Sequence, residues 1–139
     1  MNLGPWERFA AQFPYLMETL LLGVEMTIIV TLGGFVVAVA MGMLGAVLRT
    51  ARLTVLRVIG TLYVDVFRAV PVLTQLFIIY FGLAELGLKL DPIPAAIIGF
   101  GINGGAYLTE VFRAGIEAVH RGQNEAALSI GMTDRKSVV

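Results

Sequence analysis

The sequence predicts an all-α protein, a polytopic transmembrane helical bundle with about three spans. The composition supports this fold class, because 58% of the 139 residues are hydrophobic and only 14% are charged, against roughly 25% charge in soluble domains. An uncharged stretch from Met26 to Leu48 is also long enough to cross a hydrocarbon core of about 30 Å as a helix. A soluble fold of this size could not bury so much apolar surface.

The chain is expected to begin with an interfacial lead-in at residues 1–22 and to cross the membrane first at about 24–48. Trp6 and Tyr15 suit the lead-in, because amphipathic rings lie at the depth of lipid headgroups. Two glutamates precede the span and Arg49 follows it. A secretory signal has the opposite order, with basic residues first. The first span is therefore predicted to be an uncleaved helix.

Two further spans are expected, at about 58–84 and 93–117, before an incomplete cytoplasmic coupling loop at 118–139. Positive charge marks the cytoplasmic ends of spans, and the chain has one basic cluster after the first span and another after the third. The amino terminus is therefore predicted to lie outside. The first cluster consists of Arg49, Arg52 and Arg57, and the second of Arg121, Arg135 and Lys136.

Small residues recur every fourth position in the first span, at Gly34, Ala38, Gly42 and Ala46. This spacing places them on one helix face, where they let a neighbouring backbone approach closely. The alternative is that glycine and alanine are simply frequent in membrane helices. Either interpretation concerns helix packing and not chemistry.

The second span contains Asp65, Arg68, Pro71 and Gln75. A charge at bilayer depth costs at least about 2.5–3.5 kcal/mol unless it has a partner, and Asp65 and Arg68 are spaced to pair on one face. Pro71 removes a backbone donor and can free a carbonyl beside these groups. Arg68 and Gln75 are therefore candidates for a solute path, although Arg68 could instead extend to the cytoplasmic interface.

The third span carries a polar face toward its inner half. The residues of this face follow helical spacing, and glycines beside them allow close approach by another helix. Glu110 can pair with Arg113 in its own helix or with Arg68 in the previous one, and we include Glu110 and Arg113 among the candidates for the solute path. The face comprises Asn103, Tyr107, Glu110, either Arg113 or Ala114, and Glu117.

The segment from Gly122 to Gly131 predicts a short capped helix on the cytoplasmic side. Asn124 can cap its start, Glu125 suits the positive end of the helix dipole, and Gly131 can end it in the left-handed conformation. Such a rigid helix on a loop suits docking into a groove of a partner protein.

This segment resembles the cytoplasmic motif of binding-protein-dependent ABC importer permeases, which is Glu-Ala-Ala followed by three residues and Gly. The matching residues are Glu125, Ala126, Ala127 and Gly131. The stretches Tyr63 to Leu83 and Ala106 to Ile116 are similar to the polar amino-acid uptake branch of that family. Ala69 and Val70 replace the usual Gly-Thr before the proline, and His120 replaces a usual proline. The family motif continues past Gly131 into further spans, so the chain ending at Val139 is expected to be a fragment.

The resemblance implies the membrane-spanning permease subunit of an ATP-driven importer for polar amino acids, in the bacterial cytoplasmic (inner) membrane. Its expected partners are a cytoplasmic ATP-binding subunit that docks at Glu125, Ala126, Ala127 and Gly131, an extracytoplasmic solute-binding protein, a second permease copy or homologue, and membrane lipid. Two alternatives remain open, an ion-coupled carrier or channel and a non-functional truncated permease. The sequence does not specify the amino acid carried, nor whether the dimer has identical subunits.

Several function classes are not expected from the residues present. The chain has no cysteine and one histidine, so thiolate metal sites and histidine clusters are excluded. No nucleophile with a neighbouring base and no phosphate-binding glycine loop is visible, and we expect no enzyme activity, no metal and no cofactor in this subunit. Ten basic and ten acidic residues balance, so no overall basic field attracts nucleic acid.

Overall fold

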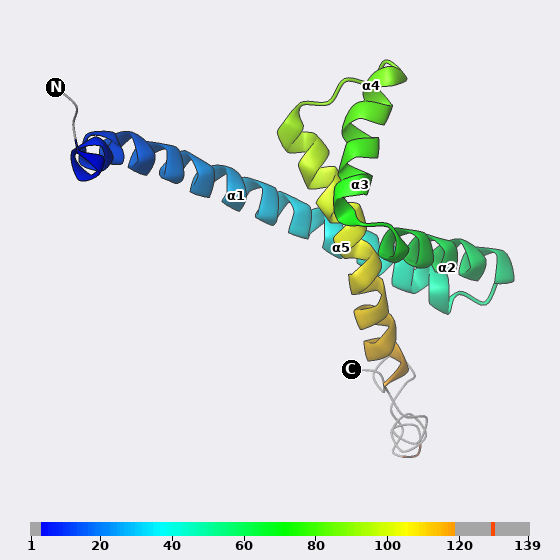
Figure 1. Cartoon of the computed structure of the whole chain (residues 1–139). Helices are drawn as coiled ribbons and strands as arrows, with labels where there is room; N and C mark the ends of the chain where they lie inside the picture. The colour runs from blue at the N-terminus through cyan, green and yellow to red at the C-terminus, as the bar shows by residue number, and fades with distance from the viewer. Residues whose placement is uncertain (1–3, 119–128, 130–139) are drawn as a thin grey trace.

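The computed structural model describes residues 4–118 and residue 129, and within these ranges every regular element is a helix. The all-α transmembrane fold class is thus confirmed. Figure 1 shows a long first helix that the last helix crosses, with the middle helices on one side of the crossing. The elements are α1 (Pro5–Thr50), α2 (Thr54–Ala69), α3 (Val72–Phe77), the π-helical η1 (Ile78–Gly82), α4 (Leu83–Glu85) and α5 (Pro92–Glu117).

Helix α1 has 46 residues, so it is about 70 Å long, roughly twice the thickness of a hydrocarbon core. The expected lead-in at 1–22 is helical from Pro5 and continuous with the first span. Both ribbon views show the first turns bent away from the rest of α1. Pro14 lies inside this part of the helix, and a proline removes a backbone hydrogen bond and kinks its helix.

Helices α1 and α5 form the main contact of the fold, and small residues bring their backbones together. Ala38, Ala46 and Ala106 are all buried. A Cβ added at Gly42 would lie 2.6 Å from the Cβ of Leu108 and 3.3 Å from the carbonyl oxygen of Gly105. Side chains larger than hydrogen would therefore separate the helices. Gly34 is also buried on this face, so all four residues of the predicted small-residue face lie at or beside the crossing.

The second expected span is two helices and not one. Helices α2 and α3–α4 meet at an angle of 106° across Val70 and Pro71. Within the described part of the chain, two single helices are long and apolar enough to cross a membrane, α1 from Phe9 onward and α5. A third span exists there only if the bent pair of α2 and α3–α4 is counted as one span. The break falls at Pro71, because this residue cannot donate the backbone bond that would continue α2, and the span at about 58–84 stays a prediction. The orientation with the amino terminus outside stays a prediction.

The connection from α4 to α5 turns at Gly87, whose φ of 86° lies in the left-handed region that glycine adopts most readily. Pro92 then begins α5, where its fixed φ suits a first helical residue. Helix α5 covers the range expected for the third span. Its first half packs beside α3 and its middle crosses α1.

Candidate functional site

The bend between α2 and α3 exposes backbone groups that a continuous helix would have paired. Helix α2 ends with the Val70 amide bonded to the Val66 carbonyl, and α3 starts after Pro71. Carbonyls freed in this way need donors, since an unsatisfied polar group in an apolar region is costly. The bend is therefore a place where polar side chains must gather.

Two side-chain amides supply these donors. The Nε2 atom of Gln75 donates to the carbonyl oxygens of Phe67, at 2.8 Å, and Val70, at 2.7 Å. Asn103 of α5 donates from Nδ2 to the same Phe67 oxygen at 2.9 Å. Gln75 is only 5% exposed, and its Oε1 atom is buried without a protein hydrogen-bond partner. The bend is thus joined to α5 and retains one unused buried acceptor.

Arg68 lies beside the bend on an aromatic ring of α5. Its guanidinium carbon is 5.1 Å from the centre of the Tyr107 ring, a cation–π distance, and both residues are exposed. The expected pair between Asp65 and Arg68 is absent among the ion pairs of the described residues. Arg68 instead turns toward α5, because that helix presents an aromatic face within reach of it.

Tyr63, one helical turn before Phe67, gives α2 a second attachment to α5. Its hydroxyl donates to the carbonyl oxygen of Ile102 at 2.7 Å, and its ring lies 5.3 Å from the Phe67 ring. The sequence analysis gave Tyr63 no such role. Its spacing of four residues from Phe67 was the available signal, because residues at that spacing share a helix face.

Glu110 forms the centre of a separate ion-pair network, at the end of the α1–α5 crossing where α1 terminates. It pairs with Arg113 in its own helix at 2.9 Å and with Arg49 of α1. Arg113 also reaches Glu117 at 2.5 Å. Of the two partners considered for Glu110, the structure selects Arg113 and not Arg68. Arg49 was missed, because it was interpreted only as a marker of the cytoplasmic side.

The four candidates for a solute path therefore divide between two places. Arg68 and Gln75 lie at the bend, while Glu110 and Arg113 belong to the ion-pair network. Asn103 and Glu110 are seven positions apart on α5, or about 10 Å along its axis. Thr109 lies between them, is 0% exposed and donates to the Gly105 carbonyl at 2.9 Å. The two clusters are thus distinct sites on one helix.

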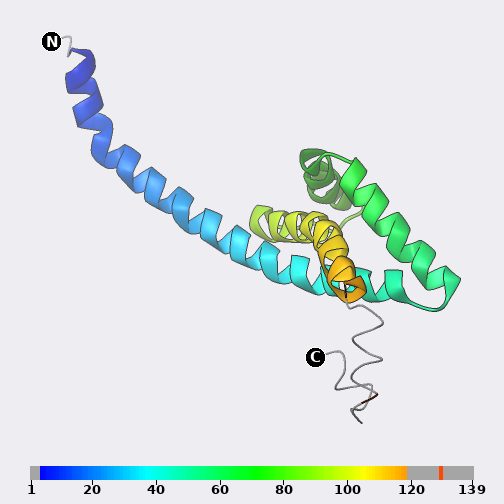
Figure 2. The ribbon, with the colours of Figure 1, turned by 90° about the horizontal axis from the view of Figure 1, so that it is seen from below.

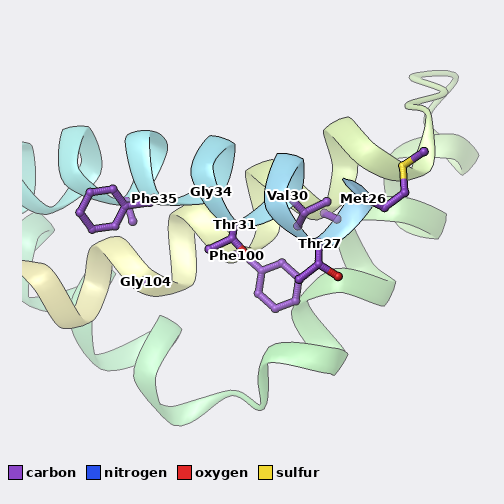
Figure 3. Close-up of a pocket in the computed structure, with 10 residues that line it drawn as sticks. Met26, Thr27, Val30, Thr31, Gly34, Phe35, Phe100 and Gly104 are labelled. Atoms are coloured by element: carbon purple, nitrogen blue, oxygen red, sulfur yellow. The ribbon is translucent and has the colours of Figure 1, made fainter. Parts of the chain in front are cut away.

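A groove of about 680 Å³ lies between α1 and α5, and no charged residue is among those that line it. In Figure 3 the side chains of Thr27, Thr31 and Phe100 lie in the space between the two helices. The Thr27 hydroxyl donates to the Gly23 carbonyl of its own helix. The groove therefore offers little to a polar solute, and the bend is the better candidate.

The predicted coupling residues Glu125, Ala126, Ala127 and Gly131 lie outside the described residues, so their docking role stays a prediction.

Comparison with known proteins bears on the same region. Residues 39–139 match the family described as "Binding-protein-dependent transport system inner membrane component". The chain belongs to this family.

Relatives within the family are named as amino-acid transporters. The chain is 38% identical over 136 residues to "Probable amino-acid permease protein YxeN" of Bacillus subtilis, covering 96% of this chain and 59% of the relative. It is 35% identical to "L-cystine transport system permease protein TcyB" of Bacillus subtilis, covering 96% of this chain and 56% of the relative.

A solved structure described as "Crystal structure of an amino acid ABC transporter with histidines" is also similar, with 33% identity and a TM-score of 0.82. The match covers 99% of this chain and 62% of the solved chain. The chain thus spans about 60% of the length of these family members. Its helices are arranged as in an ABC transporter subunit.

Proposed function

We propose that the chain belongs to the membrane-spanning permease subunit of an ATP-driven importer for polar amino acids. The polar bend carries the proposal, because it brings an exposed guanidinium and two side-chain amides together in an otherwise apolar helical fold. The names of the relatives, which include cystine, arginine and glutamine transport permeases, agree with solutes that have an α-carboxylate and an α-ammonium group.

Arg68 is the residue best placed to meet the solute. A guanidinium binds a carboxylate through two parallel hydrogen bonds, and Arg68 is exposed while the Tyr107 ring holds it against α5. Gln75 has a different role in this proposal, because both of its amide bonds are made to the bend itself. Gln75 is a positioning residue that maintains the angle at which α2 presents Arg68.

The ATP chemistry belongs to a partner in this proposal. A cytoplasmic ATP-binding subunit would dock on the segment Glu125–Gly131, and a solute-binding protein would deliver the amino acid from outside. A second permease copy or homologue would complete the path. Closure of the ATP-binding subunits would be transmitted through that segment to α5, and a ligand can drive such a change only through its differential affinity for the two states.

The test is uptake of labelled amino acids into proteoliposomes that contain the full permease, its ATP-binding subunit and its solute-binding protein. Arg68→Gln is expected to lower uptake about 10- to 100-fold, since a hydrogen bond to a charged group contributes about 1.5–3 kcal/mol. Lys89→Gln removes one charge from the loop between α4 and α5 and is expected to leave uptake unchanged. Equal uptake by Arg68→Gln and Lys89→Gln would refute the role of Arg68.

The same proteoliposomes separate the importer from an ion-coupled carrier. An importer requires ATP, whereas a carrier would accumulate solute with an ion gradient and no ATP. Glu125→Ala and Gly131→Leu are expected to weaken binding of the ATP-binding subunit. Undiminished complex formation and transport in both variants would show that this segment does not dock the partner.

A further inference from the structure

A polar pocket lies where the end of α1, the start of α2 and the end of α5 meet. Its volume is about 490 Å³, within the range of about 300–1,000 Å³ of small-molecule sites. Four arginines line it, together with Glu117 and two threonines. The arginines are Arg49, Arg52, Arg57 and Arg113.

Among the residues that the structure describes, the charges around this pocket do not balance. Arg49 and Arg113 share Glu110, and Arg113 also pairs with Glu117. Arg52 and Arg57 are exposed, and neither takes part in an ion pair among the described residues. Four arginines thus face two glutamates, which leaves two positive charges at one place. Such a pocket favours an anion with several acceptor oxygens.

The start of α2 adds to the positive potential of the pocket. The residue that precedes the helix, Leu53, makes no side-chain capping bond, and the first backbone bond joins the Arg57 amide to the Leu53 carbonyl. The amides of the first helical turn point toward this end of α2, where the helix dipole is positive. Arg52 and Arg57 lie on either side of that turn in the sequence.

The surroundings of the pocket are apolar. Leu53 is 67% exposed and Val55 is 71% exposed, and both lie between the two unpaired arginines in the sequence. A second groove, of about 480 Å³, is lined by Val47, Phe112 and Ile116, which are close in the sequence to Arg49, Arg113 and Glu117 of the polar pocket. A soluble anion would use none of this surface, whereas the acyl chains of a lipid would cover it.

From this combination we infer that the pocket binds the phosphate of an anionic phospholipid headgroup, with its acyl chains against Leu53 and Val55. Arg52 and Arg57 supply the positive charge that the protein leaves unpaired, and basic pockets between membrane helices bind anionic headgroups for this reason. The α5 residues of the site, Arg113 and Glu117, lie ten and 14 positions along the helix from Asn103 at the bend, or about 15 and 21 Å along its axis. The site therefore does not depend on the solute that the permease carries.

The test is native mass spectrometry of the full chain in a neutral detergent, titrated with phosphatidylglycerol or with phosphatidylcholine of the same acyl chains. We expect stronger retention of phosphatidylglycerol. Arg52→Gln and Arg57→Gln are each expected to weaken its binding about fivefold, since each basic residue near a lipid surface contributes about 1 kcal/mol. Both residues are exposed, and circular dichroism checks that the variants fold. Lys89→Gln is the matched control and is expected to bind as the wild type does.

Three results would overturn the inference. The first is equal affinity for the two lipids, or equal loss in the Lys89→Gln control, since either would mean non-specific attraction. The second is displacement of phosphatidylglycerol by excess inorganic phosphate in the wild type, which would identify a soluble anion as the ligand. The third is unchanged lipid binding in both arginine variants with loss of a co-purified acidic protein, which would identify a protein partner.

Discussion

Replacing Gly105 with alanine tests whether the close approach of three helices holds the fold together. A Cβ at this position would lie 2.6 Å from the Met41 Cβ and 2.7 Å from the Tyr63 hydroxyl oxygen. Because the Met41 Cβ is fixed to its backbone, α1 and α5 would have to separate. Gly115 in the same helix has no atom within 4 Å of such a Cβ, so Gly115→Ala is the matched control.

The expected magnitude follows from three contributions. Overpacking costs about 1–3 kcal/mol, and disturbing the Tyr63 hydrogen bond to α5 costs about 0.5–1.5 kcal/mol. Both variants gain about 1 kcal/mol of helix propensity when glycine becomes alanine. Gly105→Ala should therefore be less stable than Gly115→Ala by about 2–4 kcal/mol. Thermal unfolding followed by circular dichroism in detergent measures this, and coincident unfolding curves would refute the packing argument.

Further substitutions test the polar contacts. Gln75→Leu leaves carbonyls at the bend without donors and should destabilise the fold by about 1–3 kcal/mol, measured by thermal unfolding; a wild-type Tm would contradict the assigned bonds. A double-mutant cycle of Arg49→Gln and Glu110→Gln should give a coupling of about 1 kcal/mol that falls as salt is added, and no coupling would mean that the pair does not form. Thr109→Val keeps the shape but loses the hydroxyl bonds to the Gly105 carbonyl of its own helix and the Gly42 carbonyl of α1, and should cost about 0.5–1.5 kcal/mol in unfolding by denaturant; Thr19→Val, at an exposed position, is its control and should cost less.

The sequence predicted the helices and the kind of residues at the bend, because both depend on local features. An uncharged stretch of sufficient length predicts a membrane helix, and Pro71 predicts a kink or a break in the second span. The angle of 106° could not be predicted in this way. It depends on which side chains reach the freed carbonyls, and one of these, Asn103, comes from another helix.

The ion pairs were predicted less well, because they depend on how the helices cross. Glu110 and Arg113 are neighbours on one helix, and their pair was one of the two possibilities that the sequence left open. Arg49 meets Glu110 only because small residues let α1 and α5 approach closely. Asp65 and Arg68 had equally good spacing, yet Arg68 contacts Tyr107 instead. Spacing limits the possible partners, and tertiary contacts decide among them.

The Phe67 carbonyl oxygen accepts hydrogen bonds from both Gln75 of α3 and Asn103 of α5. A displacement of α5 along its axis would break the bond from Asn103 and leave the bond from Gln75 in place. Among the described residues, no hydrogen bond joins the second half of α5 to α2, so the two halves differ in their freedom to shift. Motion that starts at the carboxyl end of α5 would thus break one specific hydrogen bond at the bend between α2 and α3. The Asn103 side-chain amide is the NMR probe that would report this loss.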